Sequence, residues 1–88
     1  MSAAQAVSVS EIEAVLRAVF EPTELLVRDD SAQHAGHAGA GSGGHYFVRL
    51  RSARFAGLGR VSRHRLVYDA LGTLIARGIH ALALDLDI

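Results

Sequence analysis

The pattern of hydrophobic and polar residues predicts two helices and three strands. Hydrophobic residues recur at helical spacing over residues 12–20 and again over residues 62–77. Three stretches alternate with a period of two, as half-buried strands do: Glu24–Asp29, residues 45–52 and Ala81–Asp87. The order α-β-β-α-β predicts an α+β domain in which two main helices pack on one face of a three-stranded sheet.

Local signals predict where the helices begin and end. Ser10 with Glu13 has the form of a capping box, and Pro22 disfavours a helical residue before it. Ser62 is the expected N-cap of the second helix, and Gly78 fits a left-handed C-cap. The core side of this helix is expected to hold Leu66, Val67, Ala70, Leu71, Leu74 and Ile75.

The segment 30–44, between the first two strands, is rich in glycine and histidine. It has fifteen residues, of which five are glycine, and it carries His34 and His37. A loop of this length in a small domain is usually functional or disordered, so we expect it to be mobile. Residues 1–9 are expected to form a flexible tail, and residues 10–88 a single domain with one core.

The chain has no cysteine, which limits the chemistry open to it. Disulfides, thiolate catalysis and an all-thiolate metal site are excluded. A bound metal must therefore be held by histidine, by carboxylate or by the sulfur of a partner. The sequence has no apolar run of about 18 residues and no recognisable signal peptide, so we expect a cytoplasmic protein without membrane contact.

Basic residues are concentrated in the second half of the chain. Seven of the nine arginines lie between residues 45 and 79, where Asp69 is the single carboxylate. Arg60, Arg63, His64 and Arg65 fall at the predicted start of the second helix, where cations oppose the helix dipole. Contact with an acidic partner or with nucleic acid would explain them. Alternatively, Arg63 or Arg65 pairs with carboxylates of this chain and His64 packs against the sheet.

No combination of residues in the sequence predicts an enzyme. It has no nucleophile beside a base, no phosphate-binding loop and no H-E-x-x-H motif. Asp85 and Asp87 are interpreted as solubilising charge. Residues 55–59 with the second helix could form a helix-turn-helix that contacts DNA phosphates. That turn contains no G-x-x-G, which argues against RNA clamping of the KH type.

Six short motifs, in order along the chain, resemble the BolA-like family. They are Glu21-Pro22-Thr23, Asp30-Ser31 followed by His34-Ala35-Gly36-His37, His45-Tyr46-Phe47-Val48, Phe55-x-Gly57, Arg63-His64-Arg65-Leu66-Val67-Tyr68 and Gly78-Ile79-His80-Ala81-Leu82. Each motif is weak by itself, whereas the ordered set is specific and covers nearly the whole chain.

The resemblance implies an αββαβ fold similar to the type II KH domain and a monothiol glutaredoxin as partner. In such pairs a [2Fe-2S] cluster is shared with the glutaredoxin cysteine and a glutathione thiol, so no cofactor is expected in the isolated chain. The family pattern implies His80 and His34 as the ligands here, with His37 as the substitute. Some bacterial members regulate transcription and affect cell shape and stress responses, and DNA binding is the alternative function.

Other interpretations of these histidines stay open. His80 could be a strand-end histidine that hydrogen-bonds to the backbone, and His45 could also approach a metal. A third function is a plain interaction module that binds glutaredoxin without a cluster. Homodimer formation is also left open.

Overall fold

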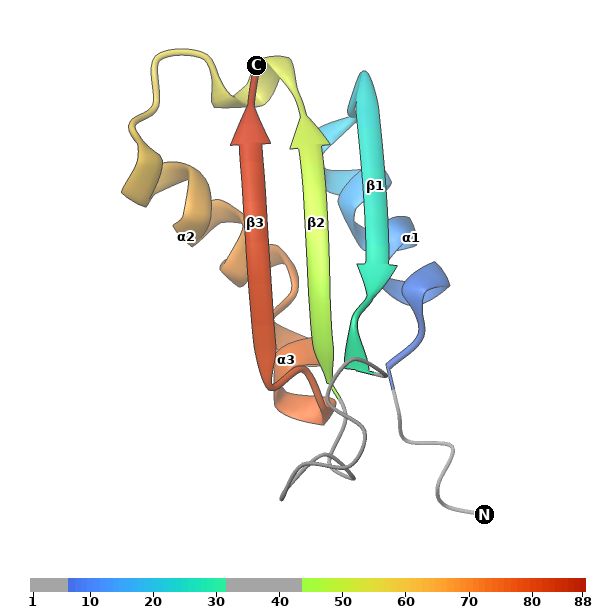
Figure 1. Ribbon diagram of the computed structural model, residues 1–88. Helices are drawn as coiled ribbons and strands as arrows, with labels where there is room; N and C mark the ends of the chain where they lie inside the picture. Colours follow the sequence, from blue (N-terminus) through green and yellow to red (C-terminus); the bar gives the residue numbers. More distant parts are fainter. Residues whose placement is uncertain (1–6, 32–43) are drawn as a thin grey trace.

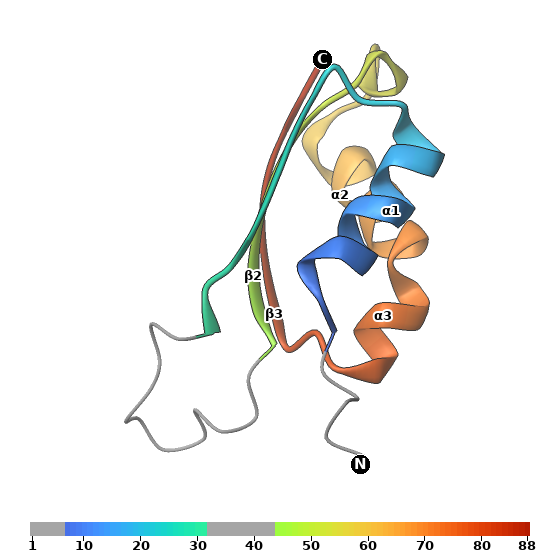
Figure 2. The ribbon, with the colours of Figure 1, turned by 90° about the vertical axis from the view of Figure 1, so that its right-hand side faces the viewer.

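The computed structural model describes residues 7–31 and 44–88, which form a three-stranded sheet with helices on one face (Figure 1). In chain order the elements are α1 (Val9–Phe20), β1 (Glu24–Asp29), β2 (His45–Arg51), the 3-10 helix η4 (Ala53–Phe55), α2 (Arg60–Ala70), α3 (Gly72–Arg77) and β3 (Ala81–Asp87). Figure 2 shows the helices together on one side of the sheet, while the other face carries none of the described helices. The predicted α+β class is confirmed.

β2 is the central strand of a mixed sheet with the order β1-β2-β3. It runs antiparallel to β1, with Val27 opposite Val48, and parallel to β3, with Val48 opposite Leu84. A parallel pair needs a long crossover, which η4, α2 and α3 supply. Tyr46, Val48 and Leu50 are buried beneath the helices, as the alternation predicts. The other face of β2 therefore meets solvent.

α1 begins earlier than the sequence predicts. Its N-cap is Ser8, whose hydroxyl accepts a hydrogen bond from the backbone N–H of Glu11, while the Glu11 carboxylate accepts one from the Ser8 N–H. The capping box expected at Ser10 and Glu13 is therefore wrong. Val7, placed in the predicted tail, is only 4% exposed, so burial of this side chain sets the earlier start. Residues 1–6 lie outside the described residues.

The predicted helix over 62–77 is two helices, α2 and α3, that meet at Leu71. Gly59, and not Ser62, is the N-cap of α2, and it makes no side-chain capping bond. Leu71 is fully buried and has φ −94° and ψ 8°, so the helical backbone is interrupted at this residue. The interruption lets hydrophobic residues of both helices reach one core.

Two further expectations for this segment are wrong. Leu66 is 40% exposed, because Val67 is the core-facing residue of its helical turn. Gly78 has φ 168°, which is extended backbone, so it is not a left-handed cap. The N–H groups of Gly78 and Ile79 instead donate to the Leu74 carbonyl at 3.0 and 3.4 Å.

Within the described part of the chain, no helix has the length and apolar character needed to cross a membrane.

Candidate functional site

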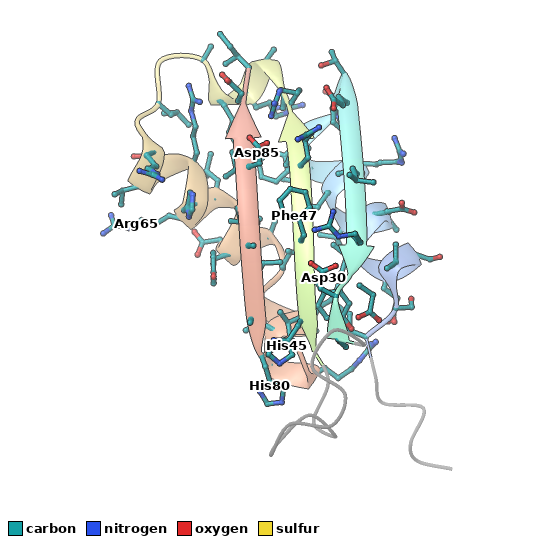
Figure 3. All side chains as sticks on the ribbon, in the orientation of Figure 1. Asp30, His45, Phe47, Arg65, His80 and Asp85 are labelled. Atoms are coloured by element: carbon teal, nitrogen blue, oxygen red, sulfur yellow. The ribbon has the colours of Figure 1, made fainter. Side chains whose placement is uncertain are left out.

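His80 lies in the turn between α3 and β3, with an exposed side chain. Figure 3 shows it at one end of the sheet, beside His45. No hydrogen bond or ion pair from the described residues reaches its imidazole, although its backbone N–H is bonded. Among those residues, therefore, nothing supports the interpretation of His80 as a side chain bonded to the backbone.

The backbone around His80 is fixed by Gly44. The Gly44 carbonyl accepts hydrogen bonds from the N–H groups of His80 and Ala81, at 2.8 and 3.0 Å. Gly44 has φ 76°, and a Cβ at this position would come within 2.2 Å of the Gly78 carbonyl oxygen. The end of the segment 30–44 therefore lies against the turn that carries His80.

The two other histidines predicted as ligands cannot be placed beside it. His34 and His37 lie outside the described residues, so their role stays a prediction. His45 is half-buried at the start of β2, where its N–H donates to the Ser31 hydroxyl at 3.1 Å and its carbonyl accepts from the Asp30 N–H at 2.7 Å. It ties together the two ends of the segment 30–44.

The described residues do not form a complete metal site by themselves. No group of three or more histidine, aspartate or glutamate side chains among them could hold a metal ion. His80 offers a single imidazole, which as a neutral ring is a good ligand for iron. This single histidine ligand fits a metal site whose other ligands come from outside the described residues.

Arg63, one of the predicted contact residues, is used inside the molecule. Its side chain is 20% exposed and lies 3.6 Å from the Asp87 carboxylate. Its guanidinium donates to the carbonyls of Leu58 and Leu86, at 2.9 and 3.4 Å, and lies 5.9 Å from the centroid of the Phe55 ring. For Arg63 the internal interpretation is confirmed, because these contacts join α2 to the end of β3.

Arg60 and Arg65 differ from Arg63. The structure pairs six of the nine arginines with carboxylates, namely Arg28, Arg49, Arg51, Arg54, Arg63 and Arg77. Arg60 and Arg65 are exposed and have no carboxylate partner within the described ranges. Figure 3 shows Arg65 directed away from the sheet. These two side chains are therefore available to a partner.

A shallow hollow of about 300 Å³ lies on α2 between these two arginines. Its lining consists of Arg60, Val61, His64, Arg65 and Tyr68. His64 is half-buried, whereas Val61 and Tyr68 are 63% and 43% exposed. The surface combines unpaired cations with apolar side chains. All of its lining residues belong to α2, whereas His80 lies in the turn that follows α3.

Asp85 has a structural role that the sequence did not reveal. Its carboxylate accepts from Arg49 and Arg51 across the sheet, at 3.2 Å in each case. The hydrogen bond from Arg49, followed by that from Arg51, lowers the pKa of Asp85. The interpretation of Asp85 as plain solubilising charge is therefore wrong. The register of β2 and β3 places Arg49 opposite Asp85, and no local sequence signal predicts this pairing.

The fold and the site define a class of protein: a small α+β domain with an exposed imidazole where the last strand begins. Comparison with known protein families gives a match over residues 16–87 to the family described as BolA-like protein. The chain belongs to this family.

Individual relatives agree with that assignment. "Protein BOLA1, chloroplastic" of Arabidopsis thaliana is 40% identical over 79 residues, which is 85% of this chain and 49% of the relative. "DNA-binding transcriptional regulator BolA" of Escherichia coli is 44% identical over 73 residues, covering 83% of this chain and 68% of the relative. The chain spans only 19% of "SufE-like protein 1, chloroplastic/mitochondrial" of Arabidopsis thaliana, at 45% identity.

Solved structures show the same fold. The BolA domain of SufE1 from Arabidopsis thaliana has a TM-score of 0.80 and 39% identity, and the match covers 90% of this chain and 88% of that one. BolA1 from Arabidopsis thaliana has a TM-score of 0.81 and 38% identity, covering 92% and 90%. The BolA relatives bear the names of a transcriptional regulator and of BolA-like proteins, and these names describe no catalysed reaction.

Proposed function

We propose that this chain is an accessory protein that pairs with a monothiol glutaredoxin and co-ligates a [2Fe-2S] cluster, for iron–sulfur trafficking or iron regulation. His80 would supply one ligand, and His34, or His37 in its place, would supply the second. The glutaredoxin cysteine and glutathione would supply the thiolates that this cysteine-free chain lacks.

The observation that carries the proposal is that the His80 side chain is exposed on a fixed backbone. Its imidazole faces solvent while its backbone is held by Gly44, so a ligand atom can be offered to a partner from a fixed position. When bound, a cluster with imidazole in place of thiolate on one iron is less negative and has a raised reduction potential. This chain contributes the imidazole and its placement.

A reconstitution experiment tests the proposal. The chain is mixed with a monothiol glutaredoxin, glutathione, iron and sulfide. The visible circular dichroism of the resulting complex is then recorded. We expect His80→Ala to abolish the spectrum of the parent pair. Arg54→Gln, which removes a cation paired with Glu21 at the other end of the sheet, is the control and is expected to leave the spectrum intact.

Single His34→Ala and His37→Ala variants then identify the second ligand. Loss of the parent spectrum in one of them assigns the ligand to that residue. A spectrum that His80→Ala does not change would contradict the proposal. A pair that forms without any visible chromophore in the parent would instead indicate a plain interaction module.

DNA binding is the second candidate function, and the two unpaired arginines on α2 favour it. The relatives in Escherichia coli and Vibrio cholerae are named DNA-binding transcriptional regulators. The slope of log affinity against log salt is negative, by about 0.9 for each phosphate contact, so the double variant Arg60→Gln/Arg65→Gln should reduce its magnitude by about 1.8. Arg54→Gln, which removes a cation already paired with Glu21, is the control. Equal slopes in the parent and the double variant would exclude this surface.

A further inference from the structure

The turn that carries His80, residues 78–80, is irregular and must be held in place by its neighbours. On the strand side, the Gly44 carbonyl binds the N–H groups of His80 and Ala81. On the helix side, the turn follows directly on Arg77, the last residue of α3. The direction of the His80 side chain therefore depends on where the end of α3 is held.

A single carboxylate joins the end of α3 to the start of α1. The Arg77 guanidinium donates to both oxygens of Glu11, one of them at 2.6 Å. The same carboxylate accepts from the N–H and the hydroxyl of Ser8, at 2.9 and 3.1 Å. Glu11 thus completes the capping box of α1 and at the same time fixes the last residue before the turn.

The residue before Ser8 lies close to the turn. Val7 is 4% exposed, and one of its methyl carbons lies 3.8 Å from the position of a Cβ on Gly78. The Val7 carbonyl accepts a hydrogen bond from the hydroxyl of Tyr46, which is buried in β2. Figure 2 shows the segment that enters α1 passing beside the turn between α3 and β3.

We propose that residues 7–11 form a brace that positions His80: Glu11 acts through Arg77, and Val7 acts through Gly78. The inference rests on the proposed function of His80, which it extends to positioning residues that do not touch a metal. Without the brace, Gly78 and Ile79 would still be bonded to the Leu74 carbonyl, but the His80 and Ala81 amides would be held by Gly44, with no support from the segment before α1.

Amide hydrogen exchange of the isolated chain tests the brace without any partner. Arg77→Gln removes the link to Glu11 and leaves the capping box in place. The loss of a partly exposed ion pair should raise exchange of the His80 and Ala81 amides about two- to fivefold. The Ser52 amide, bonded to the Asp87 carbonyl at the other end of β3, is the internal reference and should not change. Arg77→Lys should restore most of the protection.

Arg54→Gln is the matched control, because it breaks another arginine–glutamate pair at the end of the sheet remote from His80. It should leave the His80 and Ala81 amides at the parent rate. Unchanged exchange in Arg77→Gln, or an equal rise in Arg54→Gln, would overturn the brace. Val7→Ala should raise the same two rates, whereas Val61→Ala, at a site 63% exposed, should not.

The glutaredoxin complex separates failure of the brace from failure of the proposed function. We expect Arg77→Gln to weaken or alter the visible dichroism and Arg77→Lys to restore it. If His80→Ala removes the spectrum while Arg77→Gln keeps the parent one, the positioning role is wrong and the ligand role stands. If His80→Ala changes nothing, the proposed function fails, and the exchange rates alone decide whether the brace holds the turn.

Discussion

Ser52 shows how one side chain can hold several elements together. It is fully buried, and its hydroxyl donates to the carbonyl of Phe20 at the end of α1, at 2.6 Å. The same oxygen accepts from the N–H of Arg54 at 3.1 Å and so caps η4. A buried hydroxyl with both functions satisfied stabilises the fold, whereas its removal leaves buried backbone groups without partners.

We expect Ser52→Ala to lower the free energy of unfolding by about 1–3 kcal/mol, because the Phe20 carbonyl would be left unsatisfied. Urea titrations of the parent and the variant measure this difference. Ser62→Ala, at an exposed position on α2, is the control and should change it by less than about 0.5 kcal/mol. Equal values for the two variants would contradict the role of Ser52.

The lowered pKa of the Glu11 carboxyl group predicts how the free energy of unfolding depends on pH. The hydrogen bond from Arg77, with those from Ser8, lowers its pKa from 4.5 to about 2. Since the pKa is lower in the folded state, the contribution of Glu11 is fully present above about pH 4.5 and is lost as the pH falls towards 2. The urea midpoints of the parent and of Glu11→Gln should therefore differ above about pH 4.5 and approach each other as the pH falls from 4.5 towards 2. A constant difference between them down to pH 2 would show that the carboxylate is not the cause.

At the scale of elements, two glycines of the crossover between β2 and β3, Gly57 and Gly72, differ in backbone conformation. Gly57 has φ +78° with open space around it, so only its backbone conformation disfavours a side chain. Gly72 also has open space, but it is the first residue of α3 and its φ is not in the left-handed region. The same substitution should therefore have opposite effects at the two positions.

We expect Gly72→Ala to raise the free energy of unfolding by about 0.5–1 kcal/mol, because alanine loses less backbone entropy in a helix. Gly57→Ala should lower it by about 1–2 kcal/mol, the cost of left-handed backbone for a residue with a Cβ. Thermal or urea unfolding of the two variants checks the signs. Effects of the same sign would contradict the assigned conformations.

At the scale of the whole molecule, all the main helices share one core with the sheet. Its buried residues come from the segment before α1 and from α1, β1, β2, η4, α2, α3 and the turn that follows α3. The rings of Phe20 and Phe55, which are 35 positions apart, have centroids separated by 5.1 Å. A chain with one shared core should unfold as a unit.

We therefore expect a single two-state transition, with a urea dependence of about 1 kcal/mol per molar. The chain has no tryptophan and two tyrosines, so in Tyr68→Phe all tyrosine emission comes from buried Tyr46. Tyrosine emission and far-UV circular dichroism should give the same midpoint. Separate midpoints would indicate that the N-terminal brace around Tyr46 opens before the rest.

The sequence predicted the elements better than their ends. Alternation in β2 identified Tyr46, Val48 and Leu50 as buried, because side chains of a strand point to opposite faces in turn. The starts of both helices were misplaced. Ser8, beside buried Val7, is the N-cap in place of Ser10, and Gly59 is the N-cap in place of Ser62. Capping residues compete locally, and tertiary contacts decide between them.

By itself, the sequence determined the α+β class, the inward faces of the strands, the absence of any cysteine chemistry and the family motifs that single out His80. These features follow from periodicity, composition and short motifs, which act over neighbouring residues. Only the tertiary structure decided that Arg63 pairs with Asp87, that Arg60 and Arg65 have no carboxylate partner among the described residues, and that Glu11 reaches Arg77. Such contacts join side chains that are distant in the sequence; Glu11 and Arg77 are 66 positions apart. No local sequence pattern contains that information, because folding alone brings these side chains together.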